Sequence, residues 1–409
     1  MRNMGLNLSM KKILLTVTVF CLLITNAFAY SPTKLYDDVW SLIDAKYVDR
    51  NTNTQDWQKW HHKYDNQIKT DADAKVAIET MLASLNDPYT RYLDVEEFKD
   101  ENDSIKGSLK GIGVQIGIKD DKLTVIAPIE DTPAAKAGLQ SNDIILKIDE
   151  HSTKGISVKQ AADQIRGPEG TFVKLLVKRG AVEKEYSIAR QNIILKSVST
   201  TPLNDMKVPA NIGYIRLSTF INKNAAKEIA DALEKFKAKD GYILDLRSNP
   251  GGLLTNAIII SDMFLNGGKI VSTVDRDGYK ETQRDSNNYI TAKPLVVLIN
   301  GGSASASEIL SGALKDNNRA TLVGTKTFGK GVVQEINKLA DGSGVNITTQ
   351  KYLTPNGTDI HKKGIAPDVE VKMTEEDITQ KRDPQLLKGE EVLNQLIQKA
   401  ASQKTCNVN

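Results

Sequence analysis

Apolar residues with helical spacing dominate the first hundred positions of the chain. They recur at intervals of three and four, first at Leu35, Val39, Leu42 and Ile43 and again at Ile78, Met81, Leu82 and Leu85. A turn at Asn86-Asp87-Pro88 ends this pattern. We therefore expect a helical amino-terminal module, residues 30–103.

The three tryptophans of the chain, Trp40, Trp57 and Trp60, all lie in this module. A large amphipathic ring suits either the core of a helical module or a surface that a second subunit covers. The core interpretation is the simpler one, but the sequence leaves both open.

From about residue 104 to residue 190 the pattern changes to short apolar runs separated by glycines. Strands are expected at residues 111–118, 122–129, 143–149 and 172–179, with one helix at 157–167. This stretch resembles a PDZ domain, because GIGV at 111–114 is placed like its carboxylate-binding loop and EDTPAAKAGLQSNDIILKIDE follows it.

A loop flanked by glycines can direct consecutive N–H groups at a terminal carboxylate. We expect a peptide to add as an extra strand along residues 114–118, with its last side chain in an apolar pocket. The residues expected to bind the tail are Gly111, Ile112, Gly113 and Val114.

Beyond residue 200, strand and helix patterns alternate. Strands are expected at residues 212–221, 241–252 and 294–302, and helices at 223–239, 253–265 and from 306 to 316. Alternation of this kind predicts a βαβ core with a mainly parallel sheet, residues 191–375. Ligand sites in such cores lie beyond the carboxyl ends of the strands, where both NPGG and GGSASAS fall.

A final helix is expected in residues 376–409. It begins at Asp383-Pro384, with aspartate as cap and proline in the first helical position. The pattern as a whole predicts a multidomain α/β protein with a helical amino-terminal module, a PDZ-like β-rich domain, a βαβ core and a C-terminal helix.

Charge and the ends of the chain narrow the class of protein. The formal net charge is +3 and the charged residues are scattered, which argues against a nucleic-acid partner. Lys11 and Lys12 precede an apolar run that closes on Ala27-Phe28-Ala29, so residues 1–29 are expected to be a cleaved export signal, with the bacterial periplasm as the compartment. An uncleaved anchor is the alternative, although the run is shorter than the ~20 residues that span a membrane.

The two cysteines, Cys21 and Cys406, exclude an intramolecular disulfide in the exported chain. Cys21 lies within the expected signal, so only Cys406 would remain, the fourth residue from the carboxyl end. The folded protein must then depend on packing alone.

GGSASASEIL at residues 301–310 raises the question of a nucleophile. Ser305 and Glu308 have capping-box spacing, and a structural role alone would explain them. A serine hydroxyl becomes a useful nucleophile only when a base accepts its proton. His361 is the one histidine expected near the core, and its lysine-rich surroundings suggest an exposed turn, so a Ser-His-Asp triad is poorly supported.

Lys330 is the other candidate base. Burial of a lysine ammonium lowers its pKa and populates the neutral amine. Lys330 lies between Gly329 and Gly331, and two glycines allow the backbone to approach another element closely.

The residues now match a known family. The chain resembles the carboxyl-terminal processing peptidases, or tail-specific proteases, which carry a PDZ domain on a crotonase-like βαβ protease core. Beside the PDZ-like stretch, the matching motifs are LNDPYTRYL, GYIRLSTF, LDLRSNPGGLL, GGSASASEIL, GTKTFGKGVVQ and YLTPNGTDIHKKGIAPDVEV. The resemblance implies Ser305 as nucleophile, Lys330 as base and Gln334 as the residue that orients the lysine.

Physical reasoning supplies further roles. The N–H of Ala306 at a helix start would stabilise an oxyanion, and the resemblance implies the N–H of Gly251 as the second donor. Gln334 is four residues from Lys330, on the same side of the extended strand that we expect there.

The other polar residues near these motifs are given structural roles, with one exception. Ser303 and Ser307 are expected to be structural, and Asp245 and Arg247 to form an internal ion pair. Arg166, which follows the PDZ helix, is hypothesised to couple tail binding to the dyad. Full activity of Arg166→Ala on folded protein substrates would rule that out.

These inferences lead to an exported serine endopeptidase that recognises apolar C-terminal tails and cleaves with a Ser305–Lys330 dyad. It needs no metal, nucleotide or other cofactor. The expected partners are protein substrates with apolar C termini, an adaptor or activator protein, and further copies of the chain bound through the N-terminal and C-terminal helices. The alternatives are a non-catalytic PDZ scaffold and an acyl-CoA enzyme with a crotonase-type core.

Overall fold

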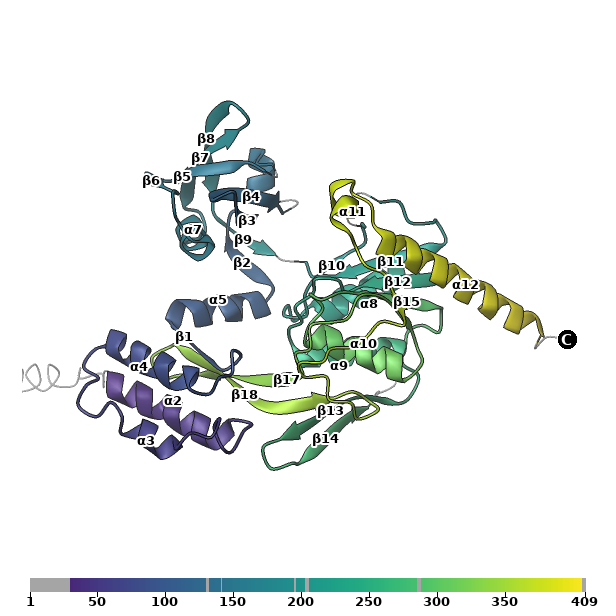
Figure 1. Ribbon diagram of the computed structural model, residues 1–409. Coiled ribbons are helices and arrows are strands. Elements are labelled where there is room, and N and C mark those ends of the chain that lie inside the picture. Colours follow the sequence, from purple (N-terminus) through teal and green to yellow (C-terminus); the bar gives the residue numbers. More distant parts are fainter. Residues whose placement is uncertain are drawn as a thin grey trace, which may run out of the picture. The chain divides into compact units, whose positions relative to one another are not determined.

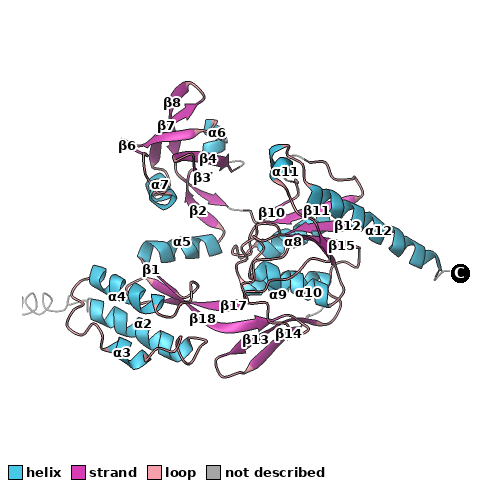
Figure 2. Ribbon diagram, viewed as in Figure 1, coloured by secondary structure: helices cyan, strands magenta, loops and turns pink. Residues whose placement is uncertain are grey.

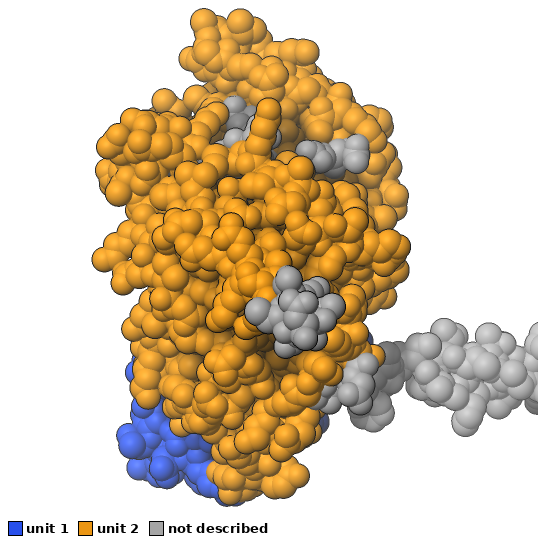
Figure 3. All heavy atoms as spheres, turned by 90° about the vertical axis from the view of Figure 1, so that its right-hand side faces the viewer, with its two compact units in different colours: residues 1–98, 334–348 blue, residues 99–333, 349–409 orange. Residues whose placement is uncertain are grey.

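The computed structural model describes residues 30–129, 132–140, 142–194, 196–202, 206–284 and 288–406 (Figure 1). The chain divides into two compact units, coloured separately in Figure 3. Unit 1 comprises Met1–Phe98 and Gln334–Thr348, and unit 2 comprises Lys99–Val333 and Thr349–Asn409. The expected export signal, residues 1–29, lies outside the described residues. Within the described ranges no helix is long and apolar enough to cross a membrane.

Unit 1 is mainly helical, as the spacing predicts. Its helices are α2 (Pro32–Lys46), α3 (Trp57–His61) and α4 (Asp71–Ala83). Its short strand β1 (Arg91–Leu93) pairs antiparallel with residues 344–346 of β18 (Gly344–Leu353).

The three tryptophans are core residues of unit 1. Each is at most 9% exposed, and the indole N–H of Trp40 donates to the carbonyl oxygen of Trp57 at 2.9 Å. The alternative that they form an oligomerisation surface is therefore wrong.

Unit 2 opens with α5 (Val95–Ile105), most of which belongs to it, and with a β-rich domain. One sheet has the order β3 (Val114–Lys119), β4 (Lys122–Pro128), β5 (Ile144–Ile148), β7 (Phe172–Arg179) and β8 (Val182–Ala189), with β6 (His151–Ser152) beside β5. The helices α6 (Pro133–Ala137) and α7 (Val158–Ile165) complete it, and β2 (Ser108–Gly111) pairs with β9 (Gln191–Ile194).

Strand β8 had no sequence signal, because only two of its eight side chains, Tyr186 and Ile188, are buried. The predicted strand at residues 172–179 coincides with β7, where apolar and polar positions alternate.

The second part of unit 2 is the βαβ core (Figure 2). Its sheet has the order β10 (Val198–Ser199), β11 (Ile212–Leu217), β12 (Gly241–Asp245), β15 (Leu295–Ile299), β16 (Thr321–Gly324) and β19 (Val369–Glu370). Every pair except β10–β11 is parallel, which confirms the prediction. Strands β13 (Lys269–Asp275) and β14 (Lys280–Arg284) form an antiparallel hairpin, and β17 (Val332–Lys338) leads to β18.

Helices cover both faces of the parallel sheet (Figure 1). Leu244 and Val297 pack in the cluster with α8 (Ala225–Lys235), α9 (Leu254–Phe264) and α10 (Ala306–Asp316). Their neighbours Ile243 and Val296 pack with α12 (Pro384–Cys406). Alternate residues of a strand point to opposite faces, and helices bury both faces of this sheet. The sequences of its strands are therefore continuous apolar runs.

A buried ionic network ties the end of β12 to the start of α12. The Arg247 guanidinium donates to Asp245 Oδ2 at 2.6 Å and to Asp383 Oδ1 at 2.7 Å, and all three side chains are at most 4% exposed. The N–H of Leu386 donates to Asp383 Oδ1 at 2.9 Å, so Asp383 also caps α12 as expected. The predicted Asp245–Arg247 pair is therefore confirmed, and a second carboxylate completes it.

Replacement of Arg247 by methionine should destabilise the core strongly. It removes the only charge in this network that compensates two buried carboxylates, and loss of one partner from a buried pair costs about 3–5 kcal/mol. Urea unfolding followed by far-ultraviolet circular dichroism measures the change.

Lys237→Met is the control, because it removes an exposed lysine that pairs with Glu234. Its unfolding midpoint should match that of the wild type. Equal midpoints for Arg247→Met and the wild type would contradict the structural role given to the network.

Candidate active site

Ser305 lies between the carboxyl end of β15 and the first turn of α10. It is the N-cap of that helix, and its φ of 54° falls in the left-handed region that L residues rarely adopt. Its side chain is only half-buried. Strained backbone at an accessible residue persists only where the surroundings enforce it, and such positions cluster at functional sites.

The carboxylate of Glu308 provides part of that enforcement. Glu308 is fully buried, and its Oε2 accepts from the backbone N–H groups of Ser305 and Lys330, at 2.9 Å in each case. Its Oε1 accepts from the hydroxyl of Thr327 at 2.6 Å and from the N–H of Gly329 at 2.7 Å. One side chain therefore binds the serine loop and the lysine loop together, and the Ser305–Glu308 arm of the predicted capping box is present.

The glycines beside Lys330 have the role predicted for them. A Cβ on Gly329 would lie 2.9 Å from the backbone nitrogen of Gly364, and one on Gly331 would lie 2.7 Å from that of His361. Such distances are shorter than any side chain permits. The Lys330 loop can therefore lie against residues 360–364 only because glycine stands on either side of it.

His361 lies in a turn, as the sequence suggested, but its side chain is less exposed than expected. It is half-buried, and its Nδ1 lies 3.3 Å from the N–H of Gly331. The expectation failed because this segment packs against a glycine. Nδ1 of His361 is thus the acceptor of a backbone hydrogen bond in the structure.

Ser303 and Ser307 are structural, as expected. Both are fully buried, and their hydroxyls donate to the carbonyl oxygens of Leu246 at 2.8 Å and Asn249 at 2.9 Å. They join the serine loop to the loop that follows β12, which contains Gly251.

Gly251 packs directly against the backbone around Ser305. Its φ is 98°, and a Cβ there would lie 2.6 Å from the carbonyl oxygen of Ala304 and 2.9 Å from the nitrogen of Ala306. Its N–H donates to Asn249 Oδ1 at 2.9 Å. The structure thus places Gly251 and Ala306 next to each other, while their use as oxyanion donors stays a prediction.

The strand expected to carry both Lys330 and Gln334 begins only at Val332, so Lys330 precedes it. The role of Gln334 in orienting the lysine stays a prediction. Gln334 belongs to unit 1, where its amide donates to the hydroxyl of Thr348 at 3.4 Å. Strand β17 begins two residues after Lys330, beyond Gly331.

Tyr352 is a site residue that sequence reasoning missed. Its hydroxyl oxygen lies 2.7 Å from the carbonyl oxygen of Lys330 and 3.1 Å from that of Ser305, and its single proton is shared between them in a three-centre hydrogen bond. It lies in β18, far from both residues in the sequence, and no motif spacing connects them.

The four residues predicted to bind a tail line one small cavity in the β-rich domain. Gly111, Ile112, Gly113 and Val114 surround about 70 Å³ together with the side of α7. Gly113 has a φ of 76°, and a Cβ there would lie 2.3 Å from that of Thr132, so only glycine fits. Arg166 also lines this cavity and forms an ion pair with Asp100 of α5.

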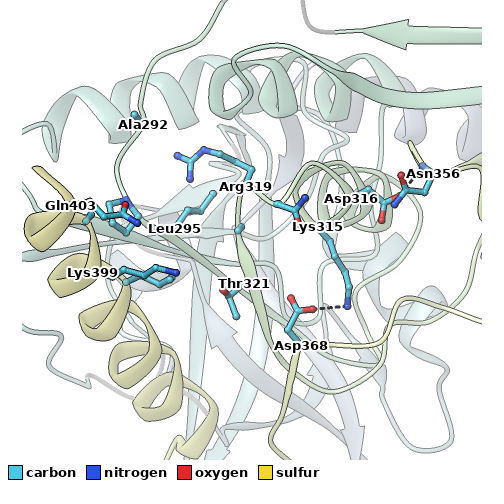
Figure 4. A pocket seen from close by; sticks show the side chains of 15 residues that line it. Ala292, Leu295, Lys315, Asp316, Arg319, Thr321, Asn356, Asp368, Lys399 and Gln403 are labelled. Atoms are coloured by element: carbon cyan, nitrogen blue, oxygen red, sulfur yellow. Dashed lines mark hydrogen bonds and ion pairs between the residues drawn. The ribbon is translucent and has the colours of Figure 1, made fainter. Parts of the chain in front are cut away.

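A separate cavity of about 790 Å³ lies at the amino ends of β15 and β16, between α10 and α12 (Figure 4). Its charged lining includes Lys315, which pairs with Asp368 at 2.8 Å, and Lys399. Ser305 follows the opposite, carboxyl end of β15, so this cavity is not the site described above.

Comparison with known proteins agrees with this geometry. Residues 211–371 match peptidase family S41, and residues 124–179 match the PDZ domain. The chain is 44% identical to the carboxyl-terminal-processing protease of Synechocystis sp. (strain ATCC 27184 / PCC 6803 / Kazusa), over 82% of this chain and 80% of that protein. The chain belongs to the carboxyl-terminal processing proteases of peptidase family S41.

Other relatives support this assignment. The carboxy-terminal processing protease CtpA of Bacillus subtilis (strain 168) is 42% identical, over 76% of this chain and 67% of that protein. Among solved structures, the photosystem II D1 C-terminal processing protease is similar with a TM-score of 0.58 and 33% identity, covering 84% of this chain and 93% of that one. The protein is thus a serine-type endopeptidase with a PDZ domain. These comparisons support neither a non-catalytic PDZ scaffold nor an acyl-CoA enzyme.

Replacement of Gly251 by alanine should abolish most activity. The new Cβ would force the backbone at Ser305 to move, and a displacement of ~1 Å at a reacting group can cost on the order of 100-fold in rate. Steady-state cleavage of an unfolded protein measures the loss.

Gly267→Ala is the matched control. Gly267 has a similar φ of 103°, but a Cβ there meets no atom within 4 Å. Both variants carry the same kind of backbone strain, so equal activities would show that contact with the serine loop is unimportant.

Proposed function

We propose that the protein is an exported endopeptidase that cleaves protein substrates with apolar C termini, with Ser305 as nucleophile and Lys330 as base. The observation that carries this proposal is the Glu308 carboxylate. Because the backbone nitrogens of Ser305 and Lys330 are each 2.9 Å from Oε2, they lie within twice that distance of each other. Backbones this close allow the side chains of a nucleophile and its base to come within hydrogen-bond reach of each other.

The reaction follows from these positions. The Ser305 hydroxyl attacks the scissile carbonyl carbon and passes its proton to the Lys330 amine, and the resulting ammonium protonates the leaving nitrogen. The Ala306 N–H at the start of α10 stabilises the oxyanion, with Gly251 as second donor. A water that the same amine deprotonates then hydrolyses the acyl-enzyme. In this proposal Gln334 orients the lysine.

Recognition of the tail is proposed to occur on β3 and α7. Among the described residues, strand β3 lies at the edge of its sheet, beside β4 alone. A peptide can therefore pair with its other side as an added strand. The cavity beside it is lined by Ile112, Val114, Ile116, Ala162 and Ile165, which suit an apolar terminal side chain. Its small volume favours a residue of limited size.

Arg166 is proposed to couple tail binding to the core. It ends α7, lines the tail cavity and pairs with Asp100, and both side chains are about one-third exposed. Helix α5, which carries Asp100, also accepts a hydrogen bond at the carbonyl oxygen of Ile105 from the N–H of Lys223 at 2.9 Å. Contacts therefore run from the cavity through α5 to the loop before α8.

The proposal also includes the periplasm as compartment, an adaptor or activator protein, and self-association through the N-terminal and C-terminal helices. The export-type sequence at residues 1–29 supports the first. Val76 of α4 and Leu387 of α12 are exposed, and self-association through these helices would cover them. Light scattering of purified residues 30–409 measures the assembly, and a monomer at all concentrations would contradict it.

Cleavage should depend on Ser305 and on the substrate tail. Residues 30–409 should cleave an unfolded reporter with an apolar C terminus faster than the same reporter with a charged C terminus. Ser305→Ala should bind the apolar reporter with unchanged affinity and cleave neither. Gel-based cleavage rates and fluorescence anisotropy measure the two properties.

Arg166→Ala tests coupling in the same assay. It should retain tail binding but lose the advantage of the apolar tail in cleavage. Binding without cleavage by the wild-type protein would instead favour a scaffold, or a latent protease that needs its activator.

Activity should rise with pH between roughly pH 6 and 9, as a lysine base loses its proton. Lys330→Arg should be inactive at every pH, because a guanidinium does not deprotonate in proteins. Lys326→Arg, an exposed lysine in the same loop, should keep both the rate and the profile. A flat profile for the wild type would rule out a lysine base.

A further inference from the structure

We propose that Tyr352 is a positioning residue of the protease, whose hydroxyl sets the separation of the serine and lysine loops. The inference rests on the proposed Ser305–Lys330 dyad and adds a residue to it. The hydroxyl of Tyr352 faces the main-chain carbonyl oxygens of Ser305 and Lys330. Its role would therefore be exerted through Ser305 and Lys330.

Tyr352 and Glu308 bind the same two residues from opposite sides of the peptide chain. Glu308 accepts from the N–H groups of Ser305 and Lys330, and their carbonyl oxygens share the one hydroxyl proton of Tyr352. The backbone of each residue is thus bound at both ends. Hydrogen bonds at both the N–H and the carbonyl oxygen restrict the orientation of each residue as well as the distance between the two residues. A reacting pair requires both.

The tyrosine itself is firmly placed. It is 1% exposed, and its own N–H donates to the carbonyl oxygen of Gly331 at 3.0 Å. Strand β18 pairs it with Thr273 of β13. A rigid strand therefore supports the hydroxyl, as positioning residues in efficient sites require.

The two carbonyl oxygens differ in how much they depend on Tyr352. The carbonyl oxygen of Ser305 also accepts from the N–H groups of Glu308 at 2.8 Å and Ile309 at 2.9 Å, within the first turn of α10. The shorter tyrosine bond goes to Lys330, at 2.7 Å. Loss of the hydroxyl should therefore disturb the lysine loop more than the serine loop.

Tyr352→Phe is the test, because it removes the hydroxyl and keeps the ring. We expect kcat on the apolar-tail reporter to fall on the order of 10- to 100-fold, with KM within about twofold of the wild type. The pH dependence of kcat should also shift, because loss of the hydroxyl changes the surroundings of the Lys330 amine. A shift in the profile would not arise from a loss of stability alone.

Tyr242→Phe is the matched control. Tyr242 is 2% exposed in β12, and its hydroxyl donates to the carbonyl oxygen of Phe236 at 3.3 Å, outside the site described above. It loses the same atom from a buried tyrosine. Its kcat and pH profile should equal those of the wild type.

Burst kinetics with an activated ester separate slow chemistry from misfolding. The burst amplitude of Tyr352→Phe should equal that of the wild type, while the burst rate falls with kcat. A wild-type kcat, or a reduced amplitude with an unchanged rate, would overturn the inference. An active Lys330→Arg variant would instead contradict the dyad itself, so the two failures are distinguishable.

Discussion

A buried carboxylate with four hydrogen-bond donors is the constraint on which the site depends. Glu308 has no exposed surface, so its charge must be compensated inside the protein. Both groups of donors belong to the loops that carry Ser305 and Lys330, which are 25 positions apart in the sequence. The free energy that would be lost by leaving this charge without donors therefore favours the folded arrangement in which nucleophile and base are close.

The rest of the core supports this carboxylate. The parallel sheet is covered on both faces and brings the carboxyl end of β15 beside the loop after β12. Arg247 ties that loop to α12, and the hydroxyls of Ser303 and Ser307 tie it to the serine loop. Gly251 then packs against the strained backbone of Ser305. Together these contacts hold the backbone of Ser305 in its strained conformation.

Sequence patterns predicted the elements with strong periodicity and the chemistry that family motifs carry. Helix α10 was expected at residues 306–316 and begins and ends there, since cap, acidic first turn and apolar spacing agree. Other features depend on tertiary contacts that no local pattern encodes. The place of Tyr352 beside Lys330 is set by pairing between distant strands, and the partial burial of His361 by contact with a segment thirty residues away. The strand expected to carry both Lys330 and Gln334 starts only at Val332, after the two glycines that flank Lys330.

The central claim is that Ser305 becomes acylated during turnover with Lys330 as the base. The most direct measurement is peptide mapping by mass spectrometry after wild-type protein is quenched in acid during turnover of a slow activated ester. The account predicts one acyl group on the peptide that contains Ser305, and a much slower appearance of the same adduct in Lys330→Arg. An adduct on another residue, or equal rates of acylation in both proteins, would contradict it.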